Sequence, residues 1–133
     1  LSIAALLESI NDVEVLVIGG VLRKGFHCTV DHRLSSLLDS VSVDKAFMGA
    51  NSFSIARGAS TPDIAQAGMK QQMISIASKV IVLCDHSKLE TNSLMVFAPV
   101  ADIDLLITDR ISPEFQNTYK ETDIEILSDN PRS

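Results

Sequence analysis

Apolar and polar positions alternate along the chain in blocks that predict helices and buried strands in turn. Residues 1–10, LSIAALLESI, place apolar side chains three and four positions apart, which predicts a helix. Residues 13–20, VEVLVIGG, are β-branched and almost continuously apolar, which predicts a buried strand ending at two glycines. The rest of the chain repeats this alternation. We expect further helices at 32–41, 63–79 and 112–122, and further strands at 46–48, 80–84, 93–99, 102–109 and 123–129.

The ends of these helices carry recognisable capping residues. Ser112 followed by Pro113 is typical of a helix start, because serine caps the first turn and proline needs no hydrogen-bond partner there. In the same way, Ser60 or Thr61 is expected to cap the helix near Pro62. Two stretches are less regular: residues 23–31 predict a loop with one short strand, and residues 52–61 a strand and a turn around Gly58.

This order of elements predicts one α/β domain over residues 1–133, with a mostly parallel sheet and helices on both faces. Hydrophobic residues make up 46% of the chain and charged residues 21%, which is typical of a soluble globular protein. The net charge of −6, with eleven scattered basic residues, argues against direct nucleic-acid binding by this chain. No apolar run is long enough to cross a membrane, and two cysteines indicate reduced thiols in the cytoplasm.

Candidate chemistry follows the predicted strands, because ligands of open α/β sheets bind beyond the carboxyl ends of the strands. Glycines, hydroxyls, one amide, one ammonium and two carboxylates occur there, and this set suits a polyhydroxylated, anionic small molecule. The positions are Gly19-Gly20, Gly49-Ala50-Asn51, Asp85-His86-Ser87-Lys88, Thr108-Asp109, and the turn Gly58-Ala59-Ser60-Thr61.

Each of these positions also has a purely structural interpretation. Asp85 to Lys88 is either the wall of a ligand site or a strand end reaching water, and Gly19-Gly20 is either a phosphate cradle or a tight strand exit. The three histidines lack metal-ligand spacing, and neither a GxGxxG nor a Walker sequence occurs, so neither a metal nor a cofactor is expected. Cys84 lies within an apolar strand and is expected to be a packed residue rather than a nucleophile.

Several motifs together resemble one known family, the effector-sensing domain of DeoR-type bacterial transcriptional repressors. They are VIGGVLRKG, then VDKAFMGANSFSIARGASTPDIAQAGMKQQMISIASKVIVLCDHSK, then DLLITD, and the resemblance covers about residues 1–129. The resemblance implies a fold similar to ribose-5-phosphate isomerase, glucosamine-6-phosphate deaminase and the CoA transferases. It also implies a phosphorylated sugar or related metabolite as effector, no catalytic role, and an attached winged helix-turn-helix that binds operator DNA as a homo-oligomer.

The resemblance also assigns ligand-binding positions. The motif residues expected to line the pocket are Gly49, Asn51, Gly58, Ser60, Thr61, Lys70, Asp85, Ser87 and Lys88, with Gly19, Gly20 and Arg23 at the Gly-Gly-x-x-Arg exit.

The sequence departs from the family pattern in two respects. The DNA-binding motif and an Asp-x-Gly-[ST]-[ST] loop would precede Leu1, so residues 1–133 are expected to be a partial sensor domain. Gln66 and Gly68 stand where the family often has acidic residues. A sugar-phosphate isomerase using Asp85 and Lys88 remains the alternative to a sensor, and a purely structural subunit is a third.

Overall fold

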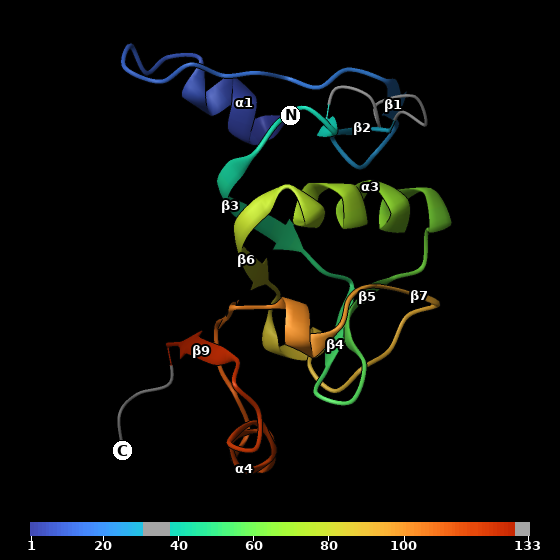
Figure 1. The fold of residues 1–133 in the computed structure, drawn as a ribbon, viewed down its shortest axis with the longest axis vertical. Helices are drawn as coiled ribbons and strands as arrows, with labels where there is room; N and C mark the ends of the chain where they lie inside the picture. The colour runs from blue at the N-terminus through green and yellow to red at the C-terminus, as the bar shows by residue number, and fades with distance from the viewer. Residues whose placement is uncertain (31–37, 130–133) are drawn as a thin grey trace.

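The computed structural model describes residues 1–30 and 38–129 (Figure 1). The helices are α1 (Ser2–Leu7), α3 (Ile64–Ser75) and α4 (Pro113–Tyr119), with 3₁₀ turns η1 (His86–Lys88) and η2 (Val100–Asp102). The strands are β1 (Val21–Arg23), β2 (Cys28–Val30), β3 (Val43–Gly49), β4 (Ser52–Ser54), β5 (Gly58–Thr61), β6 (Ala77–Leu83), β7 (Met95–Ala98), β8 (Leu105–Thr108) and β9 (Glu125–Ser128). The helix expected at 32–41 lies mostly outside the described residues.

The centre of the fold is a four-stranded parallel sheet with the order β3-β6-β8-β9. Met48, Val82 and Leu106 are neighbours across three strands of this sheet and are almost completely buried. Their side chains share one face because successive residues of a strand point to opposite sides. The predicted α/β class, with a parallel sheet and helices, is confirmed.

A second, antiparallel sheet with the order β4-β5-β7 supplies the rest of the core. Phe53 of β4 and Phe97 of β7 are buried in it, and the Phe53 ring packs against the Phe115 ring of α4 in a T-shaped arrangement. The irregular strand and turn expected around Gly58 are therefore the β4–β5 hairpin. Gly58 to Thr61 form β5 rather than a helix cap.

The two longer helices begin at capping side chains. Ser112 accepts a hydrogen bond from the Phe115 amide, 3.1 Å away, and Pro113 occupies the first turn, as predicted. For α3 the predicted cap, Ser60 or Thr61, is wrong. The cap is Asp63, two or three residues later, and its side chain accepts a hydrogen bond from the Gln66 backbone amide at 3.0 Å. Residues 77–79, expected at the end of this helix, belong to β6 instead.

The opposite face of the parallel sheet carries exposed apolar side chains. Phe47 is 62% exposed, Leu83 39% and Leu127 58%, although Ile81 between them is buried. Parallel sheets normally have both faces covered, because their crossover connections are helices. Within the described residues, no strand pairs with the outer edge of β3.

The strand expected over residues 13–20 is not formed. This segment is extended and largely exposed, with Leu16 78% exposed, and within residues 1–30 and 38–129 no strand pairs with it. A strand depends on a hydrogen-bonding neighbour, which an apolar pattern alone cannot supply. The next residues form a β1–β2 hairpin, which lies on the side of α3 away from the β4–β5–β7 sheet (Figure 1).

Candidate functional site

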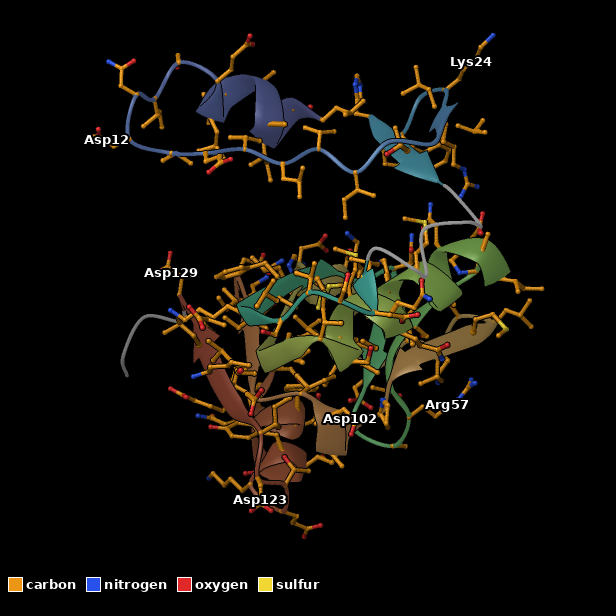
Figure 2. All side chains as sticks on the ribbon, turned by 45° about the horizontal axis from the view of Figure 1, so that its top comes forward. Asp12, Lys24, Arg57, Asp102, Asp123 and Asp129 are labelled. Carbon is orange, nitrogen blue, oxygen red and sulfur yellow. The ribbon has the colours of Figure 1, made fainter. Side chains whose placement is uncertain are left out.

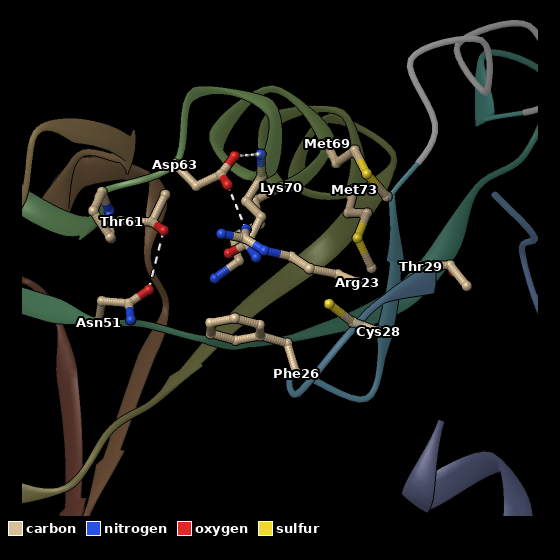
Figure 3. Close-up of a pocket in the computed structure, with 12 residues that line it drawn as sticks. Arg23, Phe26, Cys28, Thr29, Asn51, Thr61, Asp63, Met69, Lys70 and Met73 are labelled. Carbon is tan, nitrogen blue, oxygen red and sulfur yellow. Dashed lines mark hydrogen bonds and ion pairs between the residues drawn. The ribbon is translucent and has the colours of Figure 1, made fainter. Parts of the chain in front are cut away.

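A cavity of about 400 Å³ lies between the β1–β2 hairpin, α3 and the loop after β3 (Figure 3). This volume is in the range of small-molecule sites. The lining residues are Arg23, Phe26, Cys28, Thr29, Asn51, Thr61, Pro62, Asp63, Gln66, Met69, Lys70 and Met73. Four of the predicted ligand-binding residues meet here, namely Arg23, Asn51, Thr61 and Lys70.

Arg23 enters the cavity from the hairpin and forms an ion pair with Asp63. Its guanidinium also lies 4.5 Å from the centre of the Phe26 ring. Asp63 uses its other oxygen to cap α3. The hydrogen bond from the Gln66 amide, followed by the charge of Arg23, outweighs desolvation and lowers the pKa of Asp63. Asp63 therefore remains an anion at neutral pH.

Lys70 is the second cation of the cavity and is half-buried. Its ammonium donates a hydrogen bond to the Gly49 carbonyl and lies 4.5 Å from the centre of the Phe97 ring. Burial lowers the pKa of Lys70, because desolvation disfavours the charged form. Among the described residues, no carboxylate lies within ion-pair distance of this ammonium. An anion entering the cavity would supply the missing partner.

Asn51 and Thr61 form the polar side of the cavity. The Thr61 hydroxyl donates to the Asn51 side-chain oxygen at 3.0 Å, and the backbone N–H of Asn51 donates to the Ser60 carbonyl at 3.1 Å. These bonds fix the position of Asn51, and no acceptor from residues 1–30 or 38–129 is bonded to its side-chain nitrogen. Phe26, Met69 and Met73 add apolar surface, against which the faces of a sugar ring could pack.

The predicted residues at the end of β6 form a separate cluster. Asp85 caps η1 and accepts hydrogen bonds from the Ser87 hydroxyl and, at 3.0 Å, from the Ser87 amide, while Lys88 lies 3.1 Å from the other Asp85 oxygen. The Ser87 hydroxyl, followed by Lys88, lowers the pKa of Asp85 to about 2. Asp85, Ser87 and Lys88 thus form hydrogen bonds and an ion pair among themselves. They are not among the residues that line the cavity.

His86 links this cluster to the end of β8. Its Nδ1 lies 2.7 Å from an Asp109 oxygen and its Nε2 lies 2.6 Å from Arg110 Nη2. Arginine can only donate, so Nε2 accepts and Nδ1 carries the proton. Desolvation raises the pKa of Asp109, but the hydrogen bonds from the His86 ring and amide outweigh it and hold this pKa well below its usual range.

The remaining predicted glycines and Ser60 have structural surroundings. Gly49 ends β3 and contributes its carbonyl to Lys70. Gly58 and Ser60 are buried within β5, where the Ser60 hydroxyl accepts from the Ser93 amide at 3.0 Å. Gly19 and Gly20 lie in the extended segment before β1 and have no strand to terminate.

Sequence reasoning missed Asp63, Phe26 and the two cavity methionines. Asp63 could have been found, because an aspartate directly before an amphipathic run is a standard helix-cap signal. Phe26 and the methionines carry no such signal, since apolar residues of this kind are more often core.

Other kinds of site find no support in the described part of the chain. Residues 1–30 and 38–129 contain no group of three or more His, Cys, Asp or Glu side chains placed to hold a metal ion. Nor does any helix there combine the length and apolar character that crossing a bilayer requires. Cys84 is buried, and burial raises the pKa of its thiol to about 11, which makes it a packed residue.

The fold is an α/β domain with a cavity of small-molecule size, and comparison with known proteins identifies the family. The model of the DeoR C-terminal sensor domain matches residues 1–110, so the chain belongs to the DeoR family of transcriptional regulators.

Individual relatives agree with this assignment. The chain is 37% identical over 99 residues to the HTH-type transcriptional regulator GlpR of Haloferax volcanii, covering 74% of this chain and 39% of the relative. It is 32% identical over 128 residues to the HTH-type transcriptional repressor GlcR of Bacillus subtilis, covering 96% and 49%. The HTH-type transcriptional regulator IolR of the same organism is 24% identical over 120 residues, covering 90% and 48%. The chain thus spans less than half the length of these relatives.

Proposed function

We propose that this chain is the effector-sensing part of a repressor of carbohydrate metabolism, and that it binds a phosphorylated sugar in the cavity beside α3. The observation that carries the proposal is Lys70, a half-buried ammonium on the cavity wall with no carboxylate partner among the described residues. A charge removed from water is costly unless it is paired. A phosphate bound in the cavity would pair with it.

The other lining residues suit the remainder of such a ligand. Arg23 offers a planar set of donors that matches a phosphate. Asn51 and Thr61 offer an amide and a hydroxyl for sugar hydroxyl groups. The proposed site contains fewer residues than the sequence predicted, because Asp85, Ser87 and Lys88 bond to one another instead of lining the cavity.

A sugar-phosphate isomerase is less well supported. Such an enzyme needs a carboxylate base free to abstract a proton. Asp63, the carboxylate among the described lining residues, is occupied by its helix cap and by Arg23. Asp85 has its pKa lowered to about 2 and lies in the separate cluster. A binding role without catalysis is therefore proposed, in agreement with the names of the relatives.

The whole protein is proposed to be longer than this chain. Two features support this proposal. The relatives are more than twice the length of the matched segment, and within the described residues no strand pairs with the outer edge of β3 while Phe47, Leu83 and Leu127 are exposed on one face of the sheet. A preceding part of the polypeptide would complete the sheet and bind operator DNA. We further propose that the protein acts in the cytoplasm as a homo-oligomer, since symmetric repressors recognise palindromic sites.

A thermal-shift screen of phosphosugars tests the ligand class. A ligand that binds only the folded state raises its stability by mass action, so a matching phosphosugar at 100 times its Kd should add about 2.7 kcal/mol. The Lys70→Met variant should lose most of this shift. Lys120→Met removes the same charge from an exposed position at the end of α4 and should keep it. If no phosphosugar stabilises the wild type, or if Lys70→Met responds fully, the proposal is wrong.

A further inference from the structure

In the structure, the best phosphate-binding group of the cavity is already occupied by a carboxylate. Arg23 Nη1 contacts Asp63 Oδ2, while Asp63 Oδ1 accepts the Gln66 amide hydrogen at 3.0 Å (Figure 3). We propose that Asp63 is an internal competitor for Arg23, which a ligand must displace, and that dianionic phosphate esters displace it whereas monoanions do not. This inference rests on the proposed function and adds a selectivity rule to the same site.

The geometry allows this exchange without disturbing the core. Arg23 is held in place by one carboxylate and one exposed ring, that of Phe26, and both belong to the rim of the cavity. The hairpin that carries it rests mainly on α3. Asp63 can release Arg23 and still cap α3 through Oδ1. The ion pair is also partly exposed, with side-chain exposures of 35% and 27%, so water and salt weaken it.

The charges facing the cavity explain the selectivity. Arg23 and Lys70 contribute two positive charges and Asp63 one negative charge, while Cys28 is the other titratable lining residue. A monoanion offers Arg23 no more charge than Asp63 already does, and Asp63 is held nearby at high effective concentration. A dianion attracts both cations at once and gains roughly twice the Coulomb energy of a single charge. Displacement should therefore succeed for a phosphate monoester at neutral pH.

Two small esters of equal shape test the rule independently of the sugar. Methyl phosphate is mostly a dianion at pH 7.5, whereas methyl sulfate is a monoanion. Titrations followed by NMR should show the wild type binding methyl phosphate at least about ten times more tightly than methyl sulfate. Asp63→Asn should strengthen binding of methyl phosphate more than binding of methyl sulfate and so raise this ratio by about threefold or more. The dianion no longer has to displace a carboxylate, and it is freed from twice the repulsion that the monoanion experiences. Asparagine is also a good helix cap, so α3 should remain intact.

Matched variants separate the competitor role from net charge and from folding. Asp123→Asn changes the net charge equally at an exposed position, far across the molecule from Lys24 of the hairpin (Figure 2), and should leave the ratio unchanged. Asp63→Ser provides a second uncharged cap and should reproduce Asp63→Asn.

The possible results distinguish this inference from the proposed function. An unchanged ratio in both Asp63 variants, with methyl phosphate still bound, would overturn the competitor role and leave the phosphate site standing. Failure of the wild type to bind methyl phosphate, together with no response in the phosphosugar screen, would overturn both.

Discussion

Gly58 is the residue at which the fold depends most on the absence of a side chain. It has φ of +85°, a conformation that side chains rarely adopt, and it begins β5 directly against β7. A Cβ atom there would lie 2.8 Å from Pro99 Cα and even closer to the Ala98 carbonyl oxygen. These are backbone atoms, so they cannot move aside as a flexible side chain could.

Gly58→Ala is expected to destabilise the domain by about 3 kcal/mol or more, since strain at positive φ adds to the steric overlap. Gly68→Ala is the matched control: this glycine lies within α3, nothing stands within 4 Å of its missing Cβ, and alanine should stabilise the helix by about 1 kcal/mol. Urea unfolding of both variants measures the two effects. Equal midpoints for Gly58→Ala and the wild type would refute this role of Gly58.

At the level of single residues, some predicted site positions lie at the cavity and others do not. Arg23, Asn51, Thr61 and Lys70 were predicted to line a site, and they meet at one cavity. Gly58 was included on the same grounds, yet its surroundings are those of a close strand contact. A glycine in the sequence can make room either for a ligand or for a neighbouring backbone. Only the position of the neighbouring strand shows which of the two applies.

At the scale of elements, local signals predicted best. The Ser112-Pro113 start of α4 and the apolar strands β6 and β8 were correct, because caps and apolar runs act over a few residues. The strand expected at 13–20 was wrong, because pairing depends on a partner elsewhere in space. The start of α3 was misplaced because Ser60 and Thr61, both good caps by type, are held in β5.

Two aspartate caps, one at α3 and one at η1, should make the stability of the folded protein depend on pH in the acid range. Asp63 caps α3 and Asp85 caps η1, and both have a lowered pKa in the folded protein, about 2 for Asp85 against 3.8 for an ordinary aspartate. A depressed pKa contributes stability that is present above the unfolded-state value and disappears as pH falls through the folded-state value. Stability should therefore decline as pH falls from about 4 to about 2.

Thermal unfolding followed by circular dichroism across this pH range measures the effect. Asp85→Asn should show a smaller decline than the wild type, because asparagine does not titrate. Asp123→Asn, which removes an exposed carboxylate, should decline as the wild type does. A decline that is identical in all three proteins would show that these caps do not set the acid response.

At the scale of the whole molecule, the layered α/β architecture was predictable, and the exposure of apolar side chains on one face of the sheet was not. Alternating helices and strands define the sheet, but the exposure of Phe47, Leu83 and Leu127 emerges only from the assembled strands. The membership of the ligand site likewise depends on the assembled structure. Asp85, Ser87 and Lys88 follow a neighbouring strand of the sheet, yet they pair among themselves outside the cavity.

The most direct test of the central claim, that a phosphorylated sugar binds between the hairpin and α3, uses the four methionine methyl groups. Met69 and Met73 line the cavity, while Met48 lies in the core of β3 and Met95 in β7, which makes the latter two internal controls. Methyl NMR spectra should be recorded while the phosphosugar that stabilises the protein most is added. If the phosphosugar binds in this cavity, Met69 and Met73 should show saturable shifts while Met48 and Met95 stay unmoved. Shifts confined to Met48 or Met95 would contradict it.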